Sequence, residues 1–231
     1  EYLPVPRGVV WQRAANVRQD GELLTARRHF VIFNPASGRG GGGKRTDVYR
    51  SLLDEALEHV TYSSTTRPGE ERDIAEQALE EDYDVIVAVG GDGTWSNVAD
   101  RLVASGRDDV ALGILPSGTG NDFGRNFGHS LKDPRGAVRV LAEGHMRRID
   151  VGRVDTLSAS EHQPDLWERR HFLNLVGFGF DIAVIDAAKR ALFLRGEALY
   201  KFTALQQLFR FPGVHVRVES PGHEARELHH L

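Results

Sequence analysis

The sequence of 231 residues contains no cysteine. A disulfide framework and a thiolate metal site are therefore excluded, and an intracellular compartment is the simplest interpretation. No stretch comes near the roughly 20 consecutive apolar residues that a membrane-spanning helix needs. The first residues, Glu1 to Arg7, also lack the basic-then-apolar pattern of a signal peptide. We therefore expect a cytoplasmic protein that is soluble or at most peripheral to a membrane.

The sequence also has no excess of positive charge. The formal net charge is −4, whereas proteins that bind nucleic acid usually carry a basic face, so nucleic acid is not expected as a partner. The ten histidines show no metal-ligand spacing, and no Ser-His-Asp or Cys-His constellation can be argued. At 40% hydrophobic residues the composition is globular, with enough apolar material for one or two cores.

Short apolar runs alternate with segments of helical spacing through the first two thirds of the chain. Strands are predicted at 29–34, 58–63, 85–89 and 110–115, and helices at 46–60, 69–81, 95–105 and 134–143. Strands that alternate with helices indicate a parallel α/β sheet with crossover connections.

The character of the sequence changes near residue 149. Strand-like runs at 171–176 and 214–218 now flank a long helical stretch at 182–209. The predicted organisation is an N-terminal arm (1–28), an α/β domain (29–149) and a β-rich second domain (150–231).

Three glycine-rich loops follow the apolar strands, at residues 34–43, 90–94 and 117–122. In an open parallel sheet the carboxyl ends of the strands face one crevice, so these loops converge. Glycine lets the backbone approach a ligand, and the helix that follows adds a favourable dipole. A single such loop is as often only a tight turn, but three together favour a phosphate-binding crevice. The Walker phosphate loop and the dinucleotide fingerprint are both absent.

Two carboxylates stand in these loops, Asp92 and Asp122. Mg²⁺ takes few protein carboxylates and keeps several waters, so two carboxylates beside a triphosphate suit it. The alternative is that they only cap turns. Their positions in converging loops favour the role in metal binding over the role in capping turns.

Three motifs resemble those of the diacylglycerol kinase catalytic domain, in the same order and at matching intervals. They are Phe33–Gly38 (FNPASG), Gly90–Thr94 (GGDGT) and Leu115–Phe123 (LPSGTGNDF). Thr65–Gly69 resembles the family's threonine-containing nucleotide contact, and Asn174–Asp181 resembles the segment that closes over its cleft. The GGDGT motif alone is shared with NAD kinases and phosphofructokinases. The other two motifs distinguish the diacylglycerol kinase family from these enzymes.

The resemblance implies a two-domain kinase: an α/β nucleotide-binding domain of the NAD kinase/diacylglycerol kinase type, then a β-sandwich domain. It implies ATP and Mg²⁺ as cofactors and a lipid alcohol such as diacylglycerol, at a membrane surface, as acceptor. The implied nucleotide-binding residues are Asn34, Ser37, Gly38, Thr65, Gly90, Gly91, Gly93, Thr94, Gly118, Thr119 and Asn121. Asp92 is the expected catalytic residue, which organises the metal together with Asp122. The alternatives are an NAD kinase-like enzyme and a non-catalytic nucleotide-binding module, and a homodimer stays open.

The chain departs from the family pattern in two ways. Trp95-Ser96-Asn97 stands where bacterial members often carry a Leu-Asn-Glu-like triplet. Family members also usually continue well beyond this length, with a late Asp-Gly segment thought to supply the general base. We therefore expect an incomplete second domain, and no general base is identifiable.

Two sets of side chains are candidates for lipid contact. The aromatic candidates for the acceptor tail are Trp95, Phe123, Phe127, Phe178 and Phe180. The basic candidates for anionic headgroups are Lys189, Arg190, Arg195, Lys201 and Arg210.

Overall fold

The computed structural model describes residues 27–157, 167–177, 179–190, 197–218, 224 and 226–228. The chain forms two compact units, Glu1–Leu175 and Val176–Leu231. The predicted N-terminal arm lies outside the described residues, apart from Arg27 and Arg28.

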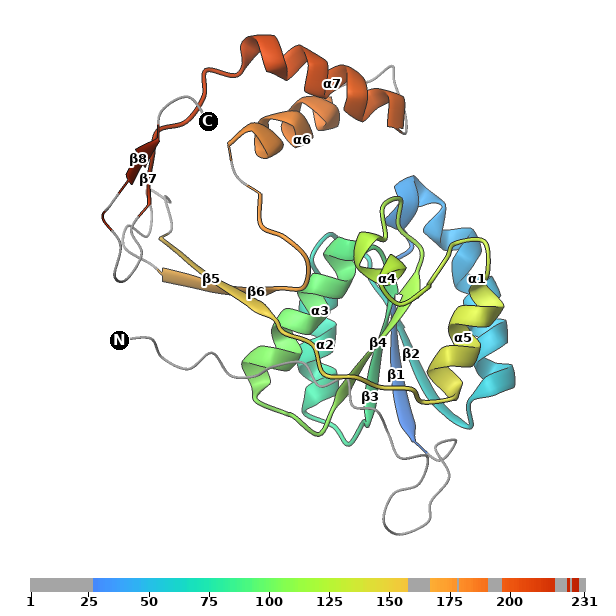
Figure 1. The fold of residues 1–231 in the computed structure, drawn as a ribbon. Coiled ribbons are helices and arrows are strands. Elements are labelled where there is room, and N and C mark those ends of the chain that lie inside the picture. Colours follow the sequence, from blue (N-terminus) through green and yellow to red (C-terminus); the bar gives the residue numbers. More distant parts are fainter. Residues whose placement is uncertain are drawn as a thin grey trace. The chain divides into compact units, whose positions relative to one another are not determined.

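A four-stranded parallel sheet is the centre of the first unit (Figure 1). In chain order its strands are β1 (Arg28–Phe33), β2 (His59–Ser64), β3 (Val85–Gly90) and β4 (Ala111–Pro116). The spatial order is β2-β1-β3-β4, and Phe33 pairs with Val89, which pairs with Leu115. Because the strands are parallel and in register, the loops that follow them leave from one edge of the sheet.

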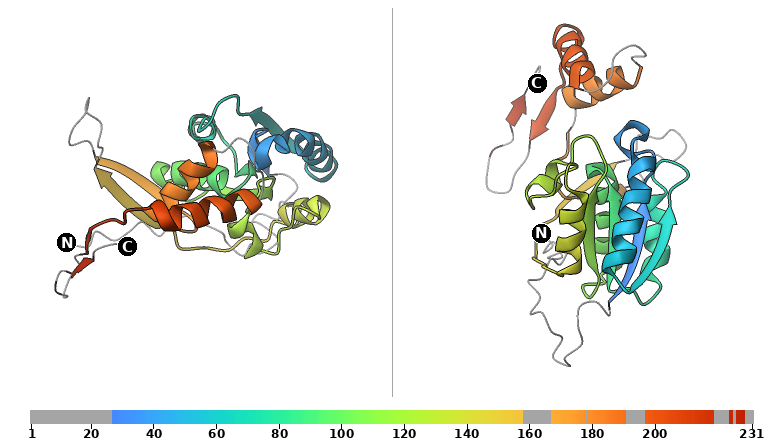
Figure 2. Two further views of the ribbon diagram at one scale, coloured as in Figure 1. Left: turned by 90° about the horizontal axis from the view of Figure 1, so that it is seen from above. Right: turned by 90° about the vertical axis from the view of Figure 1, so that its right-hand side faces the viewer.

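Helices cover both faces of this sheet (Figures 1 and 2). They are α1 (Gly42–Ala56), α2 (Glu71–Leu79), α3 (Asp92–Ser105) and α5 (Pro134–Ala142), with the short η2 (Ser37–Gly40) and α4 (Asp122–Arg125) in the loops. α2 and α3 bury Ile74 and Trp95 in one core, and α1 and α5 bury Tyr49 and Val138 in the other. The strands of a doubly covered sheet read as continuous apolar runs, as β3 does. The predicted parallel α/β fold is confirmed.

Two helices begin earlier than predicted. α1 starts at Gly42 rather than residue 46, and α3 starts at Asp92 rather than Trp95. Glycine disfavours helix, which made both segments read as loops. The α3 shift matters, because it places Asp92, Gly93 and Thr94 in the first turn of a 14-residue helix.

The first unit extends past the sheet into an antiparallel pair, β5 (Gly152–Leu157) and β6 (Trp167–Phe172). The strand predicted at 171–176 therefore ends at Phe172. The backbone N–H of His171 in β6 donates to Asp100 Oδ1 in α3 at 2.7 Å. This bond ties the pair to the sheet domain, within the compact unit that reaches Leu175. The domain boundary predicted near residue 149 stays a prediction.

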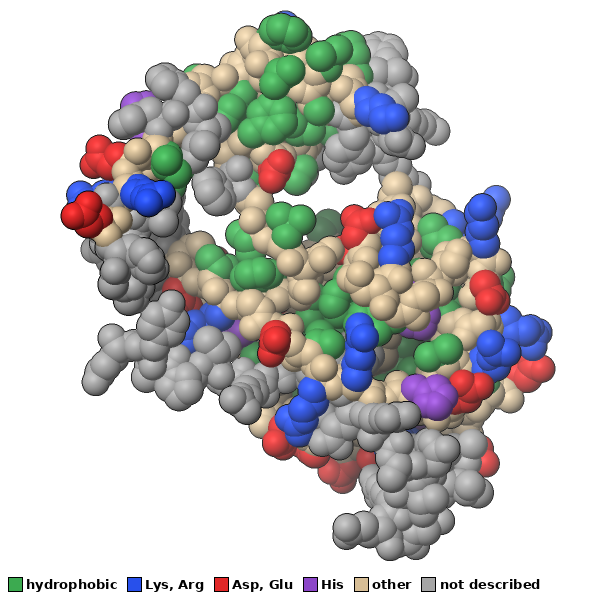
Figure 3. Space-filling view, viewed as in Figure 1, with side chains coloured by type: hydrophobic (Ala, Val, Ile, Leu, Met, Phe, Trp, Pro, Cys, Tyr) green, Lys and Arg blue, Asp and Glu red, His purple; other side chains and the backbone are tan. Residues whose placement is uncertain are grey.

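The second unit contains α6 (Phe180–Arg190), α7 (Glu197–Arg210) and the antiparallel strands β7 (Val216–Val218) and β8 (Arg226–Leu228). The helical stretch predicted at 182–209 is thus two helices. Figure 3 shows hydrophobic side chains gathered over them. The exposed apolar residues of these helices are Ile182, Ile185, Phe202, Leu205, Leu208 and Phe209. Within the described part of the chain, none of the helices has the length and apolar character needed to cross a membrane.

Candidate functional site

The loops after β1, β3 and β4 are joined by side-chain hydrogen bonds. Asn34 Nδ2 donates to Thr94 Oγ1 at 2.9 Å, which links the first loop to the second. Ser37 Oγ lies 2.9 Å from Ser117 Oγ, which links the first loop to the third. The structure therefore brings together the predicted residues of all three motifs. Ser117, which was not among them, is part of this junction, and its place within the LPSGTGNDF motif was the available signal.

Three glycines let these loops approach one another. Gly38 has φ +58°, and a Cβ there would lie 2.6 Å from the carbonyl oxygen of Ser117. A Cβ on Gly118 would lie 2.5 Å from the Cα of Gly91. Backbone atoms cannot yield as a flexible side chain can, so packing between the loops alone requires glycine at these positions.

Asn121 shapes the third loop. It is the one non-glycine residue with positive φ, 56°, among the residues the structure describes. Its Oδ1 accepts from the N–H of Gly118 at 3.0 Å, and its Nδ2 donates to the Gly118 carbonyl at 2.8 Å. The amide group is buried and turned toward its own loop, whereas the neighbouring Thr119 is exposed.

The N-terminus of α3 lies among these loops and is left uncapped. Gly91 is its N-cap and provides no side-chain hydrogen bond. Among the described residues, no acceptor engages the backbone N–H groups of Asp92, Gly93 or Thr94. Gly93 is exposed, and a Cβ there would meet nothing within 4 Å, so packing does not explain this glycine. Free N–H groups and the dipole of a long helix form an anion-binding site.

Basic residues stand in the first turn of the neighbouring helix α1. α1 begins without a side-chain cap and without acidic residues in its first turn, where Lys44 and Arg45 stand. The Arg45 guanidinium reaches the Ser117 carbonyl at 3.3 Å, so it lies at the junction of the loops. Thr65, directly after β2, donates its N–H to the Phe33 carbonyl at 2.9 Å. This bond holds Thr65 at the same edge of the sheet.

The two predicted metal carboxylates lie close together. Both come within 3.4 Å of the position that a Cβ on Gly120 would take. Asp92 accepts the backbone N–H groups of Asp122 and Phe123 at 3.1 and 2.9 Å, and Asp122 forms an ion pair with Arg125 at 2.8 Å. Asp92 therefore caps α4, and its metal role stays a prediction.

A magnesium ion fits this arrangement only if water and substrate phosphates complete its coordination. The part of the chain that the structure describes holds no group of three or more His, Asp or Glu side chains placed to bind a metal. Mg²⁺ often uses one or two carboxylates together with water and substrate phosphates. Asp92 and Asp122 supply that number.

Two aromatic candidates for lipid contact were wrong. Trp95 is fully buried, and its Nε1 donates to the Ala88 carbonyl at 3.1 Å. Phe123 packs in the same core, because α3 and α4 cover that face of the sheet. Phe180 packs edge-on against Phe211 at 5.7 Å between ring centroids. Phe178 lies outside the described residues.

A buried charge cluster beneath the site was missed from the sequence. Asp100 of α3 is 1% exposed, and its carboxylate forms ion pairs with Arg72 at 2.6 Å and Arg101 at 2.7 Å. It also contacts the backbone N and the ring Nδ1 of His171. Nearby, Asn97 donates to Glu71 Oε1 at 2.7 Å. Asn97, in the Trp95-Ser96-Asn97 segment that departs from the family triplet, is therefore hydrogen-bonded within the protein. Asp100 and His171 are 71 positions apart, so no local sequence pattern predicts their contact.

A parallel α/β sheet with joined glycine loops and an uncapped helix N-terminus at its carboxyl edge defines a class of phosphate-binding α/β proteins. Within that class, residues 28–154 match the family model described as the diacylglycerol kinase catalytic domain. This range is more than half of the chain, and the chain belongs to this family.

Curated relatives agree with the family model. A diacylglycerol kinase of Staphylococcus saprophyticus is 33% identical over 196 residues, which cover 84% of this chain and 59% of the relative. The enzyme of the same name from Staphylococcus haemolyticus is 34% identical over 192 residues, covering 82% and 53%. The chain thus spans somewhat more than half the length of these relatives.

A solved structure shares the fold. A putative diacylglycerol kinase from Bacillus anthracis strain Sterne superimposes with a TM-score of 0.55 at 22% identity, over 88% of this chain and 64% of that one.

Proposed function

We propose that this chain is the nucleotide-binding part of a lipid kinase that transfers the γ-phosphate of ATP to the hydroxyl of diacylglycerol or a related lipid alcohol. The observation that carries the proposal is the open N-terminus of α3, with three unengaged backbone N–H groups and an exposed Gly93. Membership of the diacylglycerol kinase family supports the proposed kinase chemistry and lipid acceptor. The product would enter phospholipid biosynthesis.

Phosphoryl transfer needs positioning and charge neutralisation more than covalent help from the protein. In this proposal the N–H groups of Asp92, Gly93 and Thr94 hold phosphate oxygens, and Lys44 and Arg45 approach from α1. Hydrogen bonds between the loops fix these donors before the ligand arrives, which limits the cost of ordering. When bound, Mg²⁺ supplies further neutralisation of the phosphates, with Asp92 and Asp122 as its protein ligands.

The acceptor side would lie at a membrane surface, with the protein cytoplasmic and peripheral. The exposed apolar residues of α7, with Lys201 and Arg210 on the same helix, are consistent with contact to a lipid headgroup region. The side chains of Lys189, Arg190 and Arg195 lie outside the described ones. The proposal assigns no general base.

Calorimetry and an acceptor comparison test the proposal. We expect ATP to bind the chain only weakly without Mg²⁺ and more tightly with it. For catalysis, the longest available form of the protein is supplied with [γ-³²P]ATP and either diacylglycerol in mixed micelles or NAD⁺. Label in the lipid supports the proposal, whereas label in NAD⁺ alone would establish the NAD kinase-like alternative. Nucleotide binding without transfer to either acceptor would favour a non-catalytic module.

A further inference from the structure

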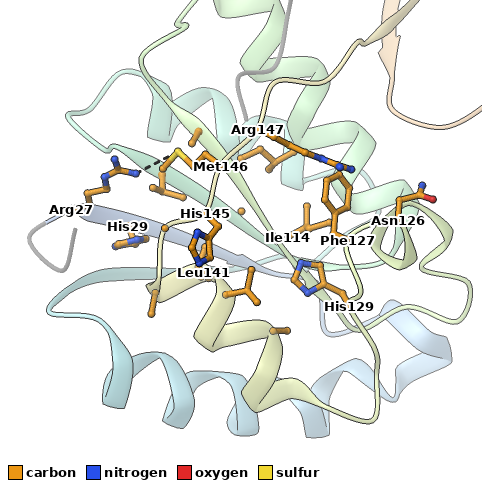
Figure 4. Close-up of a pocket in the computed structure, with 18 residues that line it drawn as sticks. Arg27, His29, Ile114, Asn126, Phe127, His129, Leu141, His145, Met146 and Arg147 are labelled. Atoms are coloured by element: carbon orange, nitrogen blue, oxygen red, sulfur yellow. Dashed lines mark hydrogen bonds between the residues drawn. The ribbon is translucent and has the colours of Figure 1, made fainter. Parts of the chain in front are cut away.

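The edge strand β4 borders a cavity that shares no residue with the proposed nucleotide site. The cavity has a volume of about 360 Å³ and lies between β4, α5 and the segment that follows α5 (Figure 4). Its walls are largely apolar, with Leu112 and Ile114 from β4 and Val140 and Leu141 from α5. This volume is near the lower end of the ~300–1,000 Å³ of small-molecule sites, so it suits a single-chain ligand rather than a two-chain lipid.

The cavity runs beside strand β4. It follows four consecutive residues of β4, from Ala111 to Ile114, which corresponds to roughly 10 Å at the rise of a β-strand. In Figure 4, Arg27, His29 and Met146 lie toward one end, and Phe127 and Arg147 lie toward the other. An extended, slender molecule fits this shape better than a compact one.

A buried polar atom at the first end has no partner. His29 is 3% exposed, and its Nδ1 has no hydrogen-bond partner within the part of the chain that the structure describes. Burial lowers the pKa of His29, although hydrogen bonding to the backbone at Arg27 and His59 opposes this shift. Native proteins rarely leave a buried polar atom unpaired, and each such atom calls for an explanation. A polar group of a ligand bound in the cavity would provide the missing partner.

Positive charge lies beside this nitrogen. The charge of Arg27 is near enough to contribute to the lowered pKa of His29, and the guanidinium donates to Met146 Sδ at 3.5 Å. A thioether is a weak acceptor, so this bond is readily exchanged for one to a carboxylate. Asp84, whose charge acts on His29 in the opposite direction, accepts the backbone N–H of Arg28 at 2.9 Å.

We propose that this cavity binds a monocarboxylate with one unbranched alkyl chain, the chemistry of a fatty acid. The carboxylate accepts hydrogen bonds from the Arg27 guanidinium and from His29 Nδ1, and the chain lies along β4 against Leu112, Ile114 and Leu141. The lining of this site shares no residue with the proposed nucleotide site, and the proposal does not depend on the kinase activity.

Calorimetric titration of the 231-residue chain with dodecanoate, below its micelle concentration, tests the site. We expect saturable binding of one dodecanoate per chain, and at least tenfold weaker binding of the uncharged dodecanol. Arg27→Gln and His29→Leu should each weaken dodecanoate binding at least tenfold. Arg28→Gln is the matched control: it removes the same charge one residue away, lies outside the cavity lining and should leave the affinity unchanged.

A stability measurement separates loss of the site from loss of the fold. Without ligand, His29→Leu should melt at or above the temperature of the parent protein, because it removes an unpaired buried nitrogen. Val140→Phe, which fills the cavity, should abolish binding of both dodecanoate and dodecanol, and ATP binding should be unchanged in every variant. Absence of saturable dodecanoate binding, equal affinity for dodecanol, or an equal loss in Arg28→Gln would each overturn the proposal.

Discussion

The first turn and the middle of helix α3 differ in how their polar groups are used. At its first turn, the N–H groups of Asp92, Gly93 and Thr94 have no acceptor among the described residues. Two turns further on, the Asp100 carboxylate is buried and accepts hydrogen bonds on both oxygens. The same helix therefore leaves N–H donors without an acceptor in its first turn and pairs its buried carboxylate at Asp100.

Helix α5 has a side-chain cap at its N-terminus, unlike α1, α2 and α3. Its N-cap Asp133 accepts from the N–H of Gly136 at 2.8 Å, and Pro134 stands at the first helical position. Such a cap usually contributes about 1 kcal/mol. α3 lacks this contribution at Gly91, as do α1 at Gly41 and α2 at Glu70. Binding of phosphate by the first turn of α3 is the role that we propose for it.

The largest effect on stability is expected at Asp100, in the middle of α3. Asp100→Ala leaves Arg72 and Arg101 without their carboxylate, and breaking a buried pair in this way costs about 3–5 kcal/mol. Urea unfolding measures the change. Asp109→Ala is the control, since it removes the exposed partner of Arg107 and should cost at most about 1 kcal/mol. Equal losses in the two variants would contradict the structural role of Asp100.

The same carboxylate predicts a dependence on pH. Burial alone would raise the pKa of Asp100, but hydrogen bonds from Arg101 and His171 and the charge of Arg72 hold it below its ordinary 3.8. Its stabilisation is therefore complete above the unfolded pKa and is lost as the pH falls through the lower folded value. The stability difference between wild type and Asp100→Asn should shrink as the pH falls below about 4. A constant difference over this range would show that Asp100 is not the titrating group.

At the open end, Asp92→Asn should remove function with little change in stability. We expect lipid phosphorylation by the longest available protein to fall at least about 100-fold, by analogy with the loss of one preorganised electrostatic group. The melting temperature should change by only a few degrees, because asparagine keeps one acceptor for the N–H groups of α4. Turnover near that of wild type would exclude the proposed metal role.

A smaller effect is expected at the capped helix. Asp133→Ala should lower the free energy of unfolding by about 1 kcal/mol and leave ATP binding unchanged, because α5 begins outside the joined loops. Calorimetry and urea unfolding on the same preparation check both parts. A loss of ATP affinity would mean that the loops depend on α5.

Much of the first unit was predictable because its signals are local. Four apolar runs predicted β1 to β4 within one or two residues, and parallel topology then placed the motif loops at one edge. The start of α3 was predicted too late because glycine at positions 91 and 93 disfavours helix, whereas burial of Trp95 and the bonds from Asp92 to α4 favour it. Tertiary contacts overrode local preference.

The uses of individual site residues were less predictable. The sequence placed Asn34, Thr94 and Asn121 near the ligand, but their side chains bond other loop atoms. The cluster around Asp100 and the cavity at His29 arise from residues far apart in the chain, so no spacing reveals them. The sequence showed that the loops are rich in glycine, but it did not show why each glycine is there. In the structure, packing requires glycine at position 118 and does not require it at position 93.

Gly93→Ala tests the central claim most directly, because stability and binding should move in opposite directions. Alanine in an open helical position should raise the free energy of unfolding by up to about 1 kcal/mol. The added methyl group should weaken Mg²⁺-ATP binding at least tenfold, since it stands where phosphate approaches the backbone. Urea unfolding and calorimetry on one preparation give both values. A stabilised variant with unchanged ATP affinity would contradict phosphate binding at the N-terminus of α3.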